Sequence, residues 1–460
     1  MNRAEKERYN MDRRAALKAL GIGVSGMIAN PLVWAEDAKR PNIVVILSDD
    51  QGFGDVSYQA HPAEVYTPHI DALANSGIRM TNGYASAFVC APTRAGLMTG
   101  RYQQRFGFYT ASDSRAGMPV DEITLADLLK KAGYRTGIFG KWHLGLTPEY
   151  HPNNRGFDEF YGFLGHGGHD YFDLNYKEDR AHNAIYRNKE IINDTGYLTD
   201  NLAREAVGFI ERNKNDPFFL YLPFNAVHAP LQAPEEDIKQ FNTGDSKRDI
   251  LMGMLKRMDI AVGDVVAALK TNGVWENTLI FYFSDNGGAR ATNANNMPLR
   301  GYKQNVYEGG LRVPFLVSWP GHLEAGGVCD EPVICMDILP TVCAAIGIPL
   351  PEDRIYDGKN MLPVLQGKTE GALHDALYWD GDSGTWAIRE GKWKLTFSRS
   401  EKLELYDLDA DIGEKNDLAN QQPEIVQRLQ KKFKAWRSQM APRIRRPRRN
   451  RNRPVQQNEE

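Results

Sequence analysis

Short apolar segments alternate with amphipathic segments along most of this chain, and this alternation limits the folds open to it. The continuous apolar runs have the length of buried strands, and the segments between them carry apolar residues at helical spacing. The runs expected as strands are NIVVIL (42–47), RTGIFG (135–140), PFFLYLPF (217–224), TLIFYF (278–283) and RVPFLVSWP (312–320). Strands that alternate with helices predict an α/β fold, a large and mostly parallel sheet with helices on both faces.

The helices expected between these strands begin and end with recognisable signals. They are ITLADLLKKAG (123–133), LTDNLAREAVGFIERN (198–213) and MDIAVGDVVAALKTNG (258–273). Gly133 follows the first as a stop signal, and Thr199 is the expected N-cap of the second.

The pattern changes past about residue 370. Four short runs with turn residues between them, from ALYWDG to KLELYDL (376–408), predict an antiparallel meander. PEIVQRLQKKFKAWRSQ (423–439) then predicts one amphipathic helix. A chain of 460 residues is long enough for one large domain, expected over 36–370, and a smaller α+β subdomain over 371–440.

The first 35 residues have the features of an export signal. Arg13 and Arg14 precede a short apolar stretch, which ends in small residues before an expected cut near Glu36. The paired arginines favour twin-arginine export, with the general secretory route as the alternative. The apolar stretch is too short and too rich in glycine for a stable membrane anchor. We therefore expect an exported protein, periplasmic or secreted.

Charge is nearly balanced overall and uneven along the chain. The formal net charge is −3, which gives no indication of nucleic-acid binding. Seven arginines lie between residues 443 and 453, so the rest of the chain carries −10. The segment 441–460 is accordingly expected to be a solvated, disordered basic tail.

Only four cysteines occur, at 90, 329, 335 and 343, although exported proteins can form disulfides. Cys335 and Cys343 lie in an apolar stretch and are expected in the core. Cys329 lies in a Gly-rich loop, and Cys90 has no evident partner, which leaves its thiol for another purpose.

Polar residues follow four of the expected strands directly. They are Asp49 and Asp50 in SDDQGFGD, Lys141 and His143 in GKWHLG, His228 in NAVHAP, and Asp285 and Asn286 in SDNGG. An Asp at such a place often only caps a helix, and a lone His is more often a surface residue. Ligands of open α/β sheets bind beyond the carboxyl ends of the strands, so we expect these groups to form one site.

The residue types indicate the chemistry of that site. Carboxylate and amide oxygens favour Ca²⁺ or Mg²⁺ over zinc. Lys141, His143, His228 and Arg94 supply positive charge and proton transfer for an oxyanion, and Lys303, in a Gly-rich loop, is a weaker candidate.

The stretch VCAPTRAGLMTGRY (89–102) places Cys90 just before a helix that Pro92 initiates, with Arg94 one turn further in. A buried structural cysteine is the simpler interpretation. The alternative is a nucleophile that faces an anion, since a helix start offers unpaired N–H groups and partial positive charge.

These motifs together resemble those of the type I sulfatases of the alkaline phosphatase superfamily, over residues 40–420. CAPTRAGLMTGRY matches the Cys-x-Pro-x-Arg signature, and GKWHLG, VHAP, SDNGG and EGGLRVP follow in the family's order. ELYDLDADIGEKNDLA is similar to its C-terminal subdomain. The resemblance implies an alkaline phosphatase-like sheet sandwiched by helices, with a C-terminal antiparallel sheet and one helix.

The resemblance also implies residue roles. A separate maturation enzyme would oxidise Cys90 to formylglycine (3-oxoalanine), whose hydrate attacks the sulfur of a sulfate ester and later expels sulfate. Asp49, Asp50, Asp285 and Asn286 match the Ca²⁺ ligands, with residue 90 beside the ion. The other matches are Arg94 for holding the diol, Lys141, His228 and Lys303 for sulfate, His228 for protonating the leaving oxygen, and His143 as the elimination base.

The chain also looks similar to bacterial polysaccharide sulfatases, and this resemblance implies a sulfated carbohydrate as the substrate. The loop 151–176 is rich in aromatic and polar residues, and within it His166 and His169 are candidate substrate contacts, or else parts of an ordinary surface loop. An algal galactan such as carrageenan is the first choice, with a glycosaminoglycan as the alternative. A formylglycine phosphonate or phosphodiester hydrolase, and a catalytically silent polyanion-binding protein that uses the arginine tail, are the competing functions.

Overall fold

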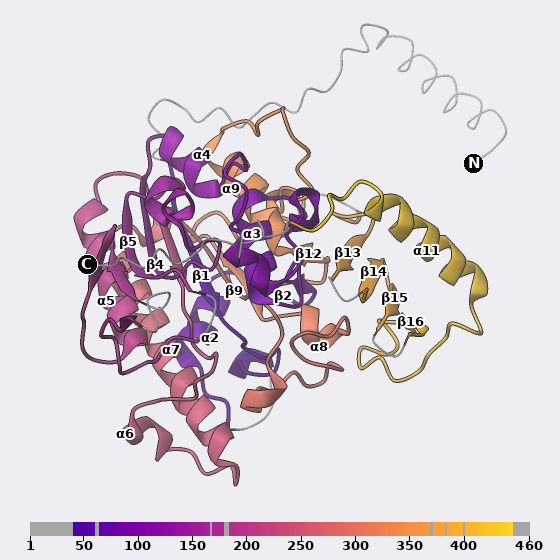
Figure 1. Cartoon of the computed structure of the whole chain (residues 1–460), viewed down its shortest axis with the longest axis horizontal. Helices are drawn as coiled ribbons and strands as arrows, with labels where there is room; N and C mark the ends of the chain where they lie inside the picture. Colours follow the sequence, from indigo (N-terminus) through magenta and orange to yellow (C-terminus); the bar gives the residue numbers. More distant parts are fainter. Residues whose placement is uncertain are drawn as a thin grey trace, which may run out of the picture. The chain divides into compact units, whose positions relative to one another are not determined.

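The five predicted apolar segments form five strands of one ten-stranded sheet (Figure 1), whose strand order is β11-β2-β10-β9-β1-β8-β4-β5-β6-β7. The other five strands of this sheet were not predicted. The structure is a computed structural model that describes residues 40–59, 64–165, 168–178, 184–368, 371–381, 384–398 and 401–444. The strands are β1 (Asn42–Ser48), β2 (Ile78–Met80), β4 (Arg135–Lys141), β5 (Glu159–Phe163), β6 (Ile185–Arg187), β7 (Glu190–Ile192), β8 (Phe218–Pro223), β9 (Thr278–Ser284), β10 (Phe315–Ser318) and β11 (Gly327–Cys329).

The centre of this sheet is parallel. β1 lies between β8 and β9 and pairs in parallel with both, and β4 does the same between β8 and β5. β10 is antiparallel to β9 and β2, and β6 is antiparallel to β5 and β7. The carboxyl ends of β9, β1, β8 and β4 therefore meet at one edge, as the predicted mostly parallel sheet requires.

Helices cover both faces of the sheet. Val44 and Ile46 of β1 belong to the apolar cluster that includes residues of α5 (Leu198–Asn213) and α7 (Ser246–Thr271), and Val45 is equally buried on the other face. Figure 1 shows α3 (Cys90–Thr99), α4 (Leu125–Lys131) and α9 (Ile338–Ile346) on the opposite side from α5 and α7. The remaining α-helices among the described residues are α2 (Pro68–Asn75), α6 (Glu235–Ile238), α8 (Glu308–Leu311), α10 (Leu362–Leu365) and α11 (Pro423–Arg437).

The starts of α4 and α5 have different N-caps, and an N-cap was predicted from the sequence only for α5. Thr124 caps α4 by accepting a hydrogen bond from Asp127 N, 3.0 Å away. The expected cap Thr199 is wrong, because α5 begins at Leu198 with Tyr197 as its N-cap. Thr199 lies buried inside the first turn, two places after the true N-cap, so a residue type that is common at N-caps was assigned to the wrong position.

The C-terminal meander forms a separate four-stranded antiparallel sheet, in the order β13-β14-β15-β16, as predicted. Its strands are β13 (Leu377–Asp380), β14 (Trp386–Glu390), β15 (Trp393–Phe397) and β16 (Leu403–Asp407). α11 packs on it, with the rings of Trp386 and Phe433 stacked 4.1 Å apart. The described residues belong to one compact unit, and the domain boundary near residue 370 stays a prediction.

Both predicted terminal segments lie largely outside the described residues. These are the export signal, 1–35, and residues 445–460 of the basic tail. The tail was expected to be solvated from 441, but residues 441–444 lie on the large domain, where Ile444 N donates to Gly107 O and Arg443 pairs with Asp113. Within the described part of the chain, no helix is long and apolar enough to cross a membrane.

Candidate active site

Seven of the predicted site residues lie at or just beyond the carboxyl ends of β9, β1, β8 and β4. They are Asp49, Asp50, Lys141, His143, His228, Asp285 and Asn286. All but His228 are fully buried or nearly so. Cys90 and Arg94 reach the same edge from α3, and Lys303 reaches it from the loop between β9 and α8.

Arg94 joins three of these strand ends. Its guanidinium lies 2.7 Å from Asp285 Oδ2 and 3.2 Å from Asp49 Oδ2, and its Nη1 donates to the carbonyl of Lys141 at 3.0 Å. The Lys141 ammonium lies 2.5 Å from the same Asp49 oxygen. The two acids and the two cations are all without solvent exposure, so their charges are balanced by one another and not by water.

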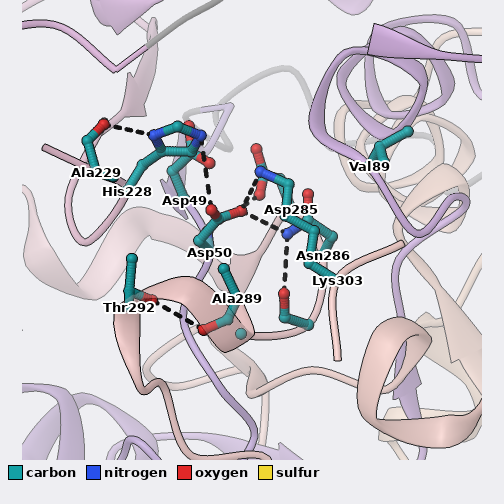
Figure 2. Close-up of polar contacts among 12 residues, drawn as sticks. Asp49, Asp50, Val89, His228, Ala229, Asp285, Asn286, Ala289, Thr292 and Lys303 are labelled. Atoms are coloured by element: carbon teal, nitrogen blue, oxygen red, sulfur yellow. Dashed lines mark hydrogen bonds and ion pairs between the residues drawn. The ribbon is translucent and has the colours of Figure 1, made fainter. Parts of the chain in front are cut away.

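Asp50 is the centre of a second set of contacts. Figure 2 shows it between His228 on one side and Asn286 and Lys303 on the other. Its carboxylate lies 2.6 Å from Lys303 Nζ, 3.6 Å from His228 Nε2 and 2.8 Å from Asn286 Nδ2. Residues 228, 286 and 303, far apart in the sequence, therefore surround the carboxylate of Asp50.

Cys90 is the first residue of α3 and is 3% exposed. Its Sγ and carboxylate oxygens of Asp49 and Asp285 all lie within 4.8 Å of one another. Burial raises the pKa of the Cys90 thiol, although Lys141 and Lys303 oppose the rise. Residue 90 is thus held at a helix start, among the acids and cations of the site, in an environment that favours the neutral thiol.

The pKa values of Asp49 and Asp285 are shifted in opposite directions by these surroundings. Burial alone would raise the pKa of Asp49, but Lys141, His228, Arg94 and Lys303 hold it below its ordinary value. Burial and the charge of Asp49 raise the pKa of Asp285 to about 6, even beside Arg94. The repulsion between two buried carboxylates is what a bound cation would relieve.

Unpaired oxygen atoms make the same edge suitable for a metal ion. Asp49 Oδ1 and Asn286 Oδ1 are buried and have no hydrogen-bond partner. Buried polar atoms are usually satisfied, so two such oxygens in one cluster fit a bound cation. Three carboxylates and an amide oxygen form a hard donor set that fits Ca²⁺.

The backbone is unusual at two of these positions. Asp50 and His143 have positive φ, 60° and 61°, a conformation that costs a non-glycine residue energy. Each of the two residues lies in the turn that follows a strand of the central sheet, and this backbone conformation sets the direction of its side chain. The main chain also approaches itself closely at Gly287, since a Cβ there would lie 1.8 Å from Gly309 O.

Sequence reasoning missed a residue that holds the His228 loop in place. The buried Tyr171 hydroxyl lies 2.7 Å from the carbonyl of Asn225 and 2.9 Å from that of His228. No local signal could have identified Tyr171, because its partners lie more than 50 residues further along the chain.

The two predicted substrate-contact histidines have different outcomes. His166 lies outside the described residues. His169 is 4% exposed, and its Nδ1 lies 2.6 Å from the carbonyl of Asp170. It lines a cavity of about 230 Å³, whose other lining residues are Gly168, Asp170, Asp173, Asn175, Lys177, Ala184 and Pro230.

A mostly parallel sheet that gathers buried acids and cations around a residue at a helix start defines an alkaline phosphatase-like hydrolase. Comparison with known families then identifies the family of such hydrolases to which the chain belongs. The sulfatase family model matches residues 41–348, and the C-terminal model of N-sulphoglucosamine sulphohydrolase matches 301–439. The chain belongs to the sulfatase family and is a sulfuric ester hydrolase.

Individual relatives agree with this assignment. The uncharacterized sulfatase YdeN of Escherichia coli is 30% identical, with 90% of this chain and 88% of YdeN covered. Human N-acetylgalactosamine-6-sulfatase is 35% identical, with 79% and 71% covered. The crystal structure of Ps i-CgsB in complex with k-i-k-neocarrahexaose is 37% identical, with 88% and 94% covered and a TM-score of 0.83.

Proposed function

We propose that this sulfatase removes sulfate from a sulfated carbohydrate, an algal galactan of the carrageenan type. The observation that carries the proposal is the position of residue 90, buried at the start of α3 against Asp49 and Asp285 and within electrostatic reach of Lys141 and Lys303. The carbohydrate substrate is supported by Ps i-CgsB, 37% identical, whose structure contains a carrageenan oligosaccharide.

We propose that Cys90 is the precursor of the nucleophile, converted to formylglycine by a separate maturation enzyme. The hydrated aldehyde supplies an oxygen that attacks the sulfur of the ester and a second hydroxyl through which sulfate is expelled. The raised pKa of the Cys90 thiol fits this role better than that of a thiolate nucleophile.

Asp49, Asp50, Asp285 and Asn286 would hold Ca²⁺, which supplies Lewis-acid charge beside residue 90. In the structure, Lys141 and Lys303 pair with Asp49 and Asp50. Both lysines are therefore within reach of an anion bound at this edge, and we assign them to sulfate binding. Arg94, paired with Asp49 and Asp285, orients residue 90 from the same helix.

His228 is the proposed proton donor to the leaving oxygen. Its Nδ1 lies 2.7 Å from the carbonyl of Ala229, which can only accept a hydrogen bond, so Nδ1 carries a proton. Nε2 faces Asp50 and is the atom that gives or takes the exchangeable proton. Because the Nδ1 proton is engaged in the hydrogen bond to the Ala229 carbonyl, a proton transferred to the leaving oxygen comes from Nε2 of the imidazolium.

His143 is the proposed base for the step that releases sulfate, and His166 and His169 are proposed substrate contacts. The cavity beside His169 is also lined by Pro230, two residues along the chain from His228, and we propose that it binds a sugar ring next to the sulfated one. The first 35 residues are proposed to direct export to the periplasm or beyond.

A glycosaminoglycan is the second candidate substrate, because human N-acetylgalactosamine-6-sulfatase is 35% identical over most of this chain. The likeness to the phosphonate monoester hydrolase of Agrobacterium radiobacter, at 22% identity and a TM-score of 0.66, extends to the fold alone.

The test is sulfate release from defined carrageenan and glycosaminoglycan oligosaccharides, with a phosphonate monoester alongside. The protein is produced with a maturation enzyme, and the Cys90→Ala variant gives the background. We expect release from carrageenan oligosaccharides only. Release from glycosaminoglycans alone would replace the first substrate by the second, and turnover of the phosphonate without sulfate release would contradict the proposal.

A further inference from the structure

Lys303 lies on a loop whose two ends contact the C-terminal sheet rather than the central one. The loop runs from Arg300 to Glu308, where α8 begins. Its middle is bound to the site, since Lys303 N donates to Gly288 O at 3.1 Å and Gln304 N donates to Phe88 O at 2.9 Å. The two ends of the loop are held by residues of the C-terminal part of the chain.

Both ends of this loop are bound by Glu414, in the segment after β16. Arg300 Nη1 donates to the carbonyl of Glu414 at 2.9 Å, and Glu308 N donates to Glu414 Oε2 at 2.7 Å. One residue thus contacts the loop through its main chain at the start and through its carboxylate at the end.

Glu414 is itself fastened by a buried ion network. Lys394 Nζ of β15 lies 2.9 Å from Glu414 Oε1 and 2.8 Å from Glu308 Oε1, and none of the three side chains is exposed. The Tyr84 hydroxyl donates to the other Glu308 oxygen at 2.6 Å. Well-packed apolar residues often stabilise a core as much as a buried ion network does. We therefore attribute this network to the precise geometry in which it holds its members.

The main chain at Glu414 supports the same interpretation. Its φ is 51°, in the left-handed region that glycine and asparagine adopt more readily. A glutamate remains in that conformation only where its contacts outweigh the cost. The contacts present are those to the loop and to Lys394, together with the hydrogen bond that Glu414 N donates to Asp411 O.

We propose that Glu414 is a positioning residue for Lys303, so that the C-terminal subdomain sets the place of a sulfate-binding ammonium. The inference rests on the proposed role of Lys303. Glu414 acts through the loop 300–308, which places Lys303 Nζ 2.6 Å from Asp50 Oδ1. Figure 1 shows α8, where the loop ends, beside the β15–β16 side of the C-terminal sheet.

The first test needs no substrate. Hydrogen exchange is measured on the full chain for the amides of 300–308, in the parent protein and in Glu414→Ala. We expect exchange there to accelerate about tenfold or more while that of β1 and β9 stays unchanged. Asp417→Ala is the matched control, because Asp417 lies in the same segment but its carboxylate accepts from Leu405 N and Ala419 N. Unchanged exchange at 300–308 would overturn the proposal.

The second test is a double-mutant cycle with Lys303→Ala, read out as KM for a sulfate ester and as Kd for inorganic sulfate. Glu414→Ala should weaken binding about tenfold in the parent and have little further effect without the Lys303 ammonium. Additive effects would mean that Glu414 does not act through Lys303. No effect of Lys303→Ala alone would instead overturn the proposed role of Lys303. Glu414→Gln, which keeps the size and one acceptor oxygen, replaces Glu414→Ala in both tests if the latter does not fold.

Discussion

Cys90 shows how its surroundings alter the chemistry of a single residue. It is one of four cysteines that form no disulfide in the structure, and Cys335 and Cys343 are buried as expected of core residues. Cys90 differs from these two because acids and cations of the site surround it. A buried neutral thiol is a poor nucleophile, which is why conversion of this residue is the central expectation.

In protein produced with a maturation enzyme, we expect residue 90 to be an aldehyde. Mass spectrometry of the peptide that contains it should give a mass below that of the cysteine form. Cys90→Ala should abolish sulfate release without changing the thermal unfolding temperature by more than a few degrees. The matched control is Cys343→Ala, a buried cysteine in α9, which should keep its activity. A fully active sample that contains only cysteine would show the expectation to be wrong.

Asp285 is expected to be required for metal binding and activity together. Asp285→Asn keeps the size of the side chain but removes the charge that faces Arg94 and any bound cation. Elemental analysis of the purified protein should find about one calcium per chain in the parent and a large loss in the variant. Asp259→Asn, at a buried acid that accepts from His69 N and Ile70 N, is the control that should keep its calcium. Zinc in the parent, or activity without metal, would contradict the assignment.

Among the structural elements, a buried pair joins two segments that are far apart in the sequence. Asp337, at the end of the short helical turn Cys335–Asp337 before α9, pairs with His374, which lies just before β13. His374 Nε2 lies 2.9 Å from Asp337 Oδ1, and the Asp337 carboxylate also accepts from Ile334 N and Lys359 N. Burial alone would lower the pKa of His374, but the charge and hydrogen bond of Asp337 raise it above its ordinary value. The pair therefore stabilises the fold most when His374 is protonated.

This pair makes stability depend on pH in a defined direction. Its contribution should be complete below about pH 6.5, the ordinary histidine pKa, and lost as pH rises through the higher folded-state value. His374→Gln should lower the free energy of unfolding by about 1–3 kcal/mol at pH 6 and by less at pH 9, measured by urea denaturation. His322→Gln is the contrasting variant, because burial lowers the pKa of His322 and its removal should not cost more stability at pH 6 than at pH 9. An equal loss at both pH values would exclude the ion pair as the cause.

For the molecule as a whole, the charge distribution bears on the substrate. A sulfated polymer is polyanionic, and the chain apart from its seven arginines carries −10. Residues 441–444 lie on the large domain, so a truncation that tests the arginines must leave them in place. Six of the seven arginines follow Ile444.

Truncation after Ile444 is expected to weaken activity on long sulfated polymers at low salt and to spare small sulfate esters. The arginines act over about one Debye length, roughly 10 Å at 0.1 M salt, so the difference should shrink as salt increases. Both substrates are assayed side by side at two salt concentrations. Equal effects on both substrates, or none on either, would identify the segment as a solvated extension.

The sequence alone determined the strand and helix alternation, because buried parallel strands need continuous apolar runs and helices need apolar residues at every third or fourth place. It also indicated which polar residues follow the strands. Asp49, Lys141, His228 and Asp285 could be expected at one edge because parallel neighbours end on the same side. The C-terminal meander was equally readable from its turns.

Only the tertiary structure decided which of these groups touch. The pairing of Arg94 with Asp285, of Lys303 with Asp50 and of Tyr171 with the His228 loop joins positions tens to hundreds of residues apart. Nor does any local pattern mark Glu414, whose importance comes from its contacts with Glu308 and Lys394. Strand and helix patterns are local because they follow the backbone's own periodicity. Contacts between side chains depend on how the sheets and loops pack, which no short stretch of sequence contains.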